Sequence, residues 1–266
     1  MSALSTGTRT SLTVPTGGVD LRVHLAVPAT LGPGTRVVVV MHGTERNARE
    51  YCDAWTGWAE THDRLVVCPE FDRESWPGAR SYVLGNVFTA KDGAGELRAE
   101  QDWSFTAVVA MHRAVRAAFG LTDRRFDLWG HSAGAQFVHR FTLFRPEAPV
   151  RLAIAANSGW YTLPDLATAF PYGLRHPLLS FTPADVARWA GGDLVLMRGE
   201  RDVLRDEHLR TAPGADAQGP SRYHRAARML RAGHAASRAC RWRLVDVPGA
   251  GHDHLAMAPV AQQLLT

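Results

Sequence analysis

Runs of apolar residues predict buried strands that alternate with helices along the chain. The segment 36–41 reads RVVVVM, a continuous β-branched run of the kind that is buried on both faces of a parallel sheet. A helical pattern of apolar residues covers 47–62, and a short strand at 65–68 is expected to end at Pro69. This alternation predicts an α/β protein with a mostly parallel sheet flanked by helices.

The remaining patterns extend this sheet in both directions. Residues 11–14 and 21–27 alternate in polarity around the turn sequence PTGG, which predicts an antiparallel hairpin at the sheet edge with one face in water. Four further strands are expected at 126–129, 152–156, 193–197 and 242–247. Helical patterns cover 101–119, 133–144, 223–236 and 255–265.

Two long segments have no regular period. Residues 70–95 predict a long loop that is rich in aromatic residues and glycine. Residues 158–190 are aromatic and carry four prolines, which fit poorly in a central strand because proline cannot donate to its ladder. We therefore expect one domain spanning 1–266, in which 158–190 forms a small cap or lid insertion.

One stretch predicts a chemically specialised turn. Only Gly130-His131-Ser132-Ala133-Gly134 joins the strand at 126–129 to the following helix, so the chain must turn very tightly there. The two glycines remove side chains that would collide with the strand and the helix. Such a turn lifts a serine hydroxyl clear of a sheet, which favours Ser132 as a nucleophile over an ordinary structural turn.

A serine nucleophile needs a general base, and the base needs an acid that orients it. On this architecture both partners follow later strands at the carboxyl edge of the sheet. The second-last strand leads into Asp202, which we prefer as the acid to Glu200, a more typical turn residue. The last strand leads into a glycine-rich turn with His252, which we prefer as the base to His254, because His254 could already belong to the closing helix.

Two backbone amides are candidates for binding an oxyanion. Ala133 directly follows the serine at the start of a helix, and Thr44 follows the turn His42-Gly43 at the end of the valine-rich strand. The alternative for the latter turn is a simple strand end. We expect His42 and His131 to pack or form hydrogen bonds rather than to transfer protons.

The composition excludes several other classes of protein. The net charge is +4 and the pI about 9.3, but the basic residues are scattered and nearly all arginine, so nucleic-acid binding is not expected. Cys52, Cys68 and Cys240 leave one thiol unpaired in any disulfide scheme, and neither metal-ligand nor phosphate-loop spacing occurs. The first residues lack the apolar region of a signal peptide, and no run could span a membrane, so we expect a cytoplasmic protein without cofactor or metal.

Together, HGT at 42–44, GHSAG, GERD and PGAGHDH resemble the α/β-hydrolase superfamily over nearly the whole chain. HGTERNAREY and VVCPEFD further resemble its polyhydroxybutyrate-depolymerase and feruloyl-esterase-like branch. The resemblance implies an α/β-hydrolase fold and hydrolysis of a small-molecule carboxylic ester through an acyl-enzyme. It assigns Ser132, Asp202 and His252 as the catalytic triad, with Thr44 and Ala133 as oxyanion donors. Amidase, peptidase or acyltransferase activity and non-catalytic binding of a small molecule are the alternatives on the same fold.

The substrate pocket has only weak signals in the sequence. Aromatic residues gather in the two long segments, where they could line an apolar acyl pocket or form the small core of the cap. The candidates for substrate binding are Trp76, Tyr82, Phe88, Trp160 and Tyr161. The sequence leaves both interpretations open.

Overall fold

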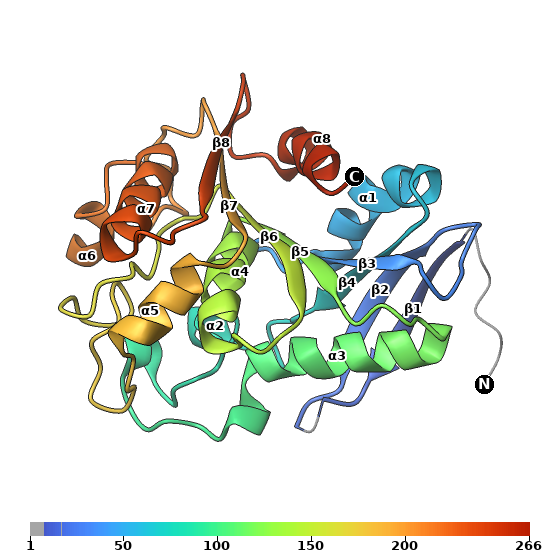
Figure 1. Ribbon diagram of the computed structural model, residues 1–266, viewed down its shortest axis with the longest axis horizontal. Coiled ribbons are helices and arrows are strands. Elements are labelled where there is room, and N and C mark those ends of the chain that lie inside the picture. Colours follow the sequence, from blue (N-terminus) through green and yellow to red (C-terminus); the bar gives the residue numbers. More distant parts are fainter. Residues whose placement is uncertain (1–7, 17) are drawn as a thin grey trace.

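A single sheet of eight strands forms the centre of the molecule (Figure 1). The computed structural model describes residues 8–16 and 18–266. The strand order is β1-β2-β4-β3-β5-β6-β7-β8, in which β2 pairs antiparallel with β1 and β4 and all other neighbours are parallel. The strands are β1 (Thr8–Val14), β2 (Leu21–Val27), β3 (Arg36–Met41), β4 (Arg64–Glu70), β5 (Phe126–His131), β6 (Val150–Ala156), β7 (Leu194–Gly199) and β8 (Arg243–Val247). The predicted α/β architecture is confirmed.

The N-terminal hairpin forms the edge of the sheet, as its alternating pattern predicts. Val14 pairs with Leu21, and the register continues to Thr8 opposite Val27. Gly17 of the predicted turn lies outside the described residues. Residues 1–7 also lie outside them, and the expectation about a signal peptide falls partly on that segment.

The structure corrects the prediction that β4 ends at Pro69. The strand continues through Pro69 to Glu70, and Pro69 is paired with Val23 of β2. The parallel register between β3 and β4 ends at Val67, so Pro69 lies beyond that ladder. A missing amide hydrogen is tolerated there because the proline has a partner strand on one side only.

Helices cover both faces of the sheet, and alternate residues of the central strands reach each layer. The helices are α1 (Ala48–Thr61), α2 (Gly78–Ser81), α3 (Ser104–Phe119), α4 (Ala133–Phe144), α5 (Pro183–Ala190), α6 (Pro213–Asp216), α7 (Arg222–Ala236) and α8 (His254–Leu264). The helices α1 and α8 lie on the same side of the sheet (Figure 1), and Val38 and Val40 of β3 belong to the hydrophobic cluster on that side. Val39 and Met41 point to the opposite layer, which contains α3 and α4.

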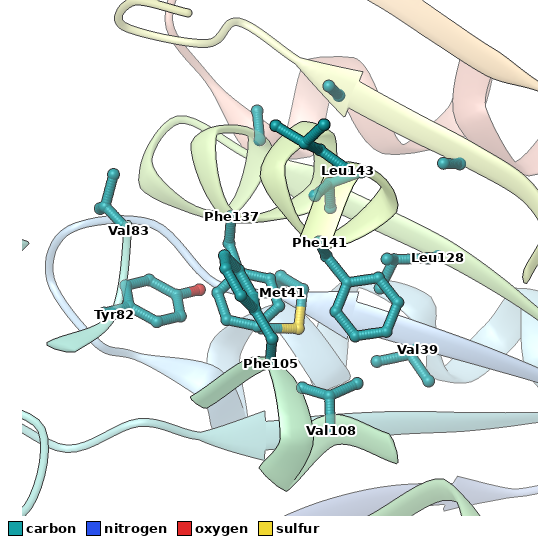
Figure 2. Packing of buried hydrophobic residues seen from close by; sticks show 14 of the residues in the cluster. Val39, Met41, Tyr82, Val83, Phe105, Val108, Leu128, Phe137, Phe141 and Leu143 are labelled. Carbon is teal, nitrogen blue, oxygen red and sulfur yellow. The ribbon is translucent and has the colours of Figure 1, made fainter. Parts of the chain in front are cut away.

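The layer on the side of α3 and α4 is rich in aromatic rings. Figure 2 shows Phe105 of α3 and Phe137 and Phe141 of α4 packed together above β3. The centroids of the Phe105 and Phe137 rings are 4.9 Å apart, with an edge-on geometry that aromatic quadrupoles favour. Since α4 starts directly after Ser132, this packing fixes the helix that follows the predicted nucleophile.

The insertion 158–190 lies between β6 and β7 and contains α5 near its end. Its buried side chains, among them Phe170 and Trp189, belong to the same hydrophobic cluster as α3 and α4. A capping box formed by Thr182 and Asp185 starts α5. The insertion thus packs on the main core of the sheet, and its assignment as a cap or lid remains a prediction.

No helix of residues 8–16 and 18–266 has both the length and the hydrophobicity that a membrane crossing requires. The three cysteines are free thiols, and Cys52 and Cys68 are buried. Burial raises the pKa of the Cys68 thiol well above its usual value, so this thiol stays protonated and packs as a small hydrophobic group.

Candidate active site

The turn between β5 and α4 holds Ser132 in a strained backbone conformation. Its φ of 56° and ψ of −114° lie in a region that residues with a side chain rarely adopt. A Cβ on Gly130 would collide with the carbonyl of Gly134, and a Cβ on Gly134 with the carbonyl of Met41. Both glycines are therefore required for the close approach of strand, turn and helix. The geometry is that of a nucleophile elbow.

Ser132, His252 and Asp202 form a continuous chain of hydrogen bonds. The distance from His252 Nε2 to Ser132 Oγ is 3.0 Å, and the distance from His252 Nδ1 to Asp202 Oδ2 is 2.8 Å. A carboxylate only accepts hydrogen bonds, so Nδ1 carries the proton and Nε2 is free to accept the serine proton. Asp202 is buried, while 23% of the His252 side chain is exposed. The arrangement can activate the serine hydroxyl as a nucleophile.

The two competing residues have other contacts. Glu200 Oε2 accepts a hydrogen bond of 3.2 Å from the Gly249 amide and so joins the turns that follow β7 and β8. His254 is the first residue of α8 and stacks on Tyr51, with ring centroids 4.1 Å apart. The sequence-based preference for Asp202 and His252 therefore agrees with the geometry, and their catalytic role remains a prediction.

The turn after β3 lies against the serine and is held rigidly by His42. The Phe71 amide donates to His42 Nε2 at 3.1 Å, so the ring proton is on Nδ1, which donates to the Gly43 carbonyl at 2.9 Å. Burial lowers the pKa of His42 to about 3, so this ring stays neutral. A Cβ on Gly43 would lie 3.9 Å from the Ser132 Cβ. The Thr44 amide thus follows a fixed turn beside the nucleophile.

The amides predicted to bind an oxyanion are those of Thr44 and Ala133. Within the part of the chain that the structure describes, neither amide donates to a protein acceptor. Ala133 is the first residue of α4, where the helix dipole also favours negative charge. Both groups are therefore available to a ligand, as an oxyanion hole requires.

A second histidine, His131, packs against His252. The centroid of the His131 ring is 4.7 Å from that of His252, and the Tyr51 hydroxyl lies 3.0 Å from His131 Nδ1. Burial lowers the pKa of His131 well below its usual value. His131 is therefore a neutral packing group, as the sequence interpretation expects.

Asn157 and Arg222 were missed by the sequence interpretation. Asn157 follows β6 with a φ of 51°. Its side chain donates to the Gly251 carbonyl at 2.9 Å and accepts from the Gly199 amide at 2.7 Å. It thereby ties the loop of the acid to the loop of the histidine. An asparagine directly after a buried strand was its only signal, because asparagine tolerates positive φ. Arg222 contacts Asp202 and had no local signal.

A small open cavity of about 180 Å³ lies over the serine. Most of its lining residues are of polar types, and they come from the carboxyl end of β5, the loops after β3, β5, β7 and β8, and the starts of α1 and α8. The lining residues are Gly43, Thr44, Glu45, Asn47, Tyr51, His131, Ser132, His208, His252 and His254. No residue of the insertion 158–190 is among them.

The five aromatic residues predicted to bind substrate do not line this cavity, which corrects that expectation. Tyr82, Phe88, Trp160 and Tyr161 are each at most 3% exposed and pack in the hydrophobic core. Trp76 borders a different hollow of about 360 Å³.

The contacts of these rings explain their placement. The Tyr82 hydroxyl donates to the His42 carbonyl at 2.8 Å and so supports the turn beside the serine. Phe88 packs on Phe170 of the insertion, with ring centroids 5.5 Å apart. Burial of large apolar rings stabilises the fold, which favours the core over an open polar cavity.

Comparison with solved structures gives two close matches over almost the whole chain. A poly(aspartic acid) hydrolase from Sphingomonas sp. KT-1 is 33% identical with a TM-score of 0.92, covering 98% of this chain and 99% of its own. A poly(3-hydroxybutyrate) depolymerase from Bordetella parapertussis is 36% identical with a TM-score of 0.89, covering 97% and 90%. An S-formylglutathione hydrolase from Staphylococcus aureus, 14% identical over 97% of both chains with a TM-score of 0.55, shares the fold. No family model and no curated protein matches the sequence.

Proposed function

This chain belongs to the α/β-hydrolase superfamily, and on that premise we propose that it is a serine hydrolase that cleaves carboxylic esters. The observation that carries the proposal is the hydrogen-bonded chain from Ser132 through His252 to Asp202. A chain of this kind at a strained elbow has a chemical use, because it removes the serine proton as the hydroxyl attacks a carbonyl carbon.

The proposed reaction has two halves. His252 Nε2 takes the proton of Ser132 during attack and returns it to the leaving alcohol, which leaves an acyl-enzyme. Water then attacks the acyl carbon with His252 as base, the bond to Ser132 Oγ breaks as His252 returns the proton to that oxygen, and the carboxylic acid leaves. Asp202 holds the imidazole in the required tautomer, while the amides of Thr44 and Ala133 stabilise the oxyanion by a few kcal/mol per donor.

Amide hydrolysis is the second candidate, and one comparison favours it. The similar hydrolase from Sphingomonas is named for poly(aspartic acid), whose units are joined by amide bonds. The same groups serve both reactions, and an amide differs mainly in needing protonation of the leaving nitrogen. The polar, open cavity is compatible with either substrate.

Labelling with a fluorophosphonate probe tests the proposal. We expect the probe to attach to Ser132, located by mapping of the modified peptide, and labelling to disappear in Ser132→Ala. Ser158, which is fully buried, is an internal control that should stay unmodified. An unlabelled wild-type protein would favour a binding module without an activated serine.

A graded set of substrates then separates the activities. Nitrophenyl esters from acetate to palmitate, methyl ferulate and a matched nitroanilide compare acyl length and leaving group. Because the cavity is small, we expect short esters to react fastest. Faster turnover of the anilide than of the matched ester would transfer the proposal to amide hydrolysis.

A further inference from the structure

A buried arginine stands directly behind the predicted catalytic acid. Arg222 is the first residue of α7, and its side chain is 1% exposed. Its Nη1 atom lies 3.3 Å from Asp202 Oδ1, while the other carboxylate oxygen of Asp202 faces His252. The acid is thus held between an imidazole and a guanidinium.

The same guanidinium forms an ion pair with a second carboxylate, that of Asp206. Nη1 and Nη2 of Arg222 lie 2.6 and 2.8 Å from the two oxygens of Asp206, a bidentate pair. Asp206 Oδ1 also accepts a hydrogen bond from the amide of His208, whose side chain lines the cavity over the serine. One side chain therefore connects the acid, the cavity wall and α7.

The charges around the histidine make this contact important for proton transfer. Asp202 and Asp206 are negative, Arg222 carries a permanent positive charge, and His252 becomes positive during the reaction. Because Arg222 lies beside the two carboxylates, its positive charge partly offsets the stabilisation that they give to protonated His252. It also offsets the cost of burying Asp202, whose side chain is 1% exposed.

The other ionisable groups near His252 are neutral or peripheral. His131 packs on its ring from β5, and His254 follows it at the start of α8. Burial lowers the pKa of His131 and of His254, so neither ring is charged at neutral pH. His208 lines the outer cavity, and Asp253 caps α8.

We propose that Arg222 is a positioning residue that fixes the orientation of Asp202 and sets the charge balance in which His252 accepts a proton. The inference rests on the proposed serine hydrolase function. It assigns to one arginine both the alignment of the acid and the attachment of the segment 202–208 to α7.

Two substitutions of opposite charge effect test the proposal by the pH dependence of kcat/KM. Arg222→Met leaves the two carboxylates without their cation, which favours protonated His252. The acid limb of the pH profile, where kcat/KM falls as the pH decreases, should therefore move to higher pH. Asp206→Asn removes a negative charge and moves the limb to lower pH. Each shift should be on the order of one pH unit. Arg222→Lys keeps the positive charge but lacks the planar guanidinium. Its acid limb should therefore stay at the wild-type pH, while kcat falls about tenfold.

Arg225 provides a matched control on the same helix. It is fully buried and pairs with Asp216 and with the carbonyls of Gly159 and Arg210. Arg225→Met should lower the melting temperature and leave kcat and the pH limb of the folded protein unchanged. Arg222→Met should lower kcat about ten- to hundredfold with little change in KM.

If the acid limbs of Arg222→Met and Asp206→Asn do not move in opposite directions, Arg222 has only a structural role. The same conclusion follows if Arg222→Met and Arg225→Met lose equal factors in kcat. If Arg222→Met does not fold, Asp206→Asn and Arg222→Lys still decide the question. Fluorophosphonate labelling of the wild type separates the two proposals. An unlabelled wild type contradicts the hydrolase function, whereas a labelled wild type with unchanged variants contradicts only the role of Arg222.

Discussion

The loops around Ser132 and the insertion 158–190 contain similar side chains in opposite environments. At Ser132, polar groups stand in an open cavity and the backbone is strained. In the insertion, several aromatic and polar groups are buried. Thr162, for example, bonds to the Pro171 carbonyl. Strain and exposure thus coincide with the proposed site of chemistry, whereas the insertion adds buried side chains to the core.

Two histidines express this difference most clearly. His252 is partly exposed, and its Nε2 faces a hydroxyl proton that it can accept. His139 of α4 is fully buried; its Nδ1 faces the Ala135 carbonyl, and its Nε2 accepts from the amide of Thr162 in the insertion. Under the proposed function the His252 ring changes its protonation state, whereas the His139 ring must remain neutral to accept from the Thr162 amide.

The largest expected effect is at the serine and its base. Ser132→Ala or His252→Ala should each lower kcat by about a millionfold, and the double variant should lose little more, because the residues act as a unit. Both variants should melt within a few degrees of the wild type, since neither side chain is part of the core. Substantial turnover by Ser132→Ala, measured with nitrophenyl acetate, would contradict the assignment of the nucleophile.

The acid should have the next largest effect. Asp202→Asn keeps the shape of the side chain but favours the wrong tautomer of His252, so kcat should fall by about ten-thousandfold. Glu200→Gln serves as the control, because its amide oxygen can still accept from Gly249. A larger loss in Glu200→Gln than in Asp202→Asn would transfer the acid role to Glu200.

The oxyanion turn comes third. If the Thr44 amide is the donor, Thr44→Pro should lower kcat by about a hundred- to a thousandfold, because proline has no amide hydrogen. Thr44→Ala keeps that hydrogen and should stay within about tenfold of the wild type. Circular dichroism and a thermal melt control for distortion of the turn. Equal losses in two folded variants would indicate that the hydroxyl, and not the amide, contacts the substrate.

The sequence predicted the sheet and the elbow well because their signals are local. A β-branched run, paired glycines around Ser132 and a glycine stop after α3 each require one backbone geometry. Gly120, for example, ends α3 with a φ of 62°. The order of the strands then brings Asp202 and His252 to the same edge, so the site residues could be proposed from topology.

The sequence-based predictions that failed, and the residues that were missed, all depend on contacts between distant segments. An aromatic ring looks the same in sequence whether it lines a pocket or fills a core, and Tyr82 and Trp160 fill the core. Pro69 could remain in β4 only because its ladder with β3 ends earlier. Arg222 lies 20 residues beyond the acid that it contacts, and no periodicity encodes that distance.

The smallest expected effect concerns the neutral histidine that anchors the insertion. Burial lowers the pKa of His139 well below its usual value, so the folded ring stays neutral at pH values where the unfolded ring, whose pKa is about 6.5, begins to be protonated. The unfolded state then binds one more proton, and the free energy of unfolding decreases as the pH falls. This histidine should therefore contribute a loss of stability that begins as the pH falls through about 6.5.

Urea denaturation of the wild type and of His139→Gln at both pH values measures this contribution. Glutamine can still accept from the Thr162 amide but does not titrate, so the variant's free energy of unfolding should decrease less than that of the wild type between pH 7 and pH 5. The exposed His234 of α7 is the control, and His234→Gln should keep the wild-type pH dependence. The same comparison by limited proteolysis should locate the first acid-induced cleavage within 158–190, because His139 gains its proton only when the Thr162 amide and the insertion have detached from the ring. First cleavage in β7, or an unchanged pH dependence in His139→Gln, would mean that this neutral histidine does not hold the insertion in place.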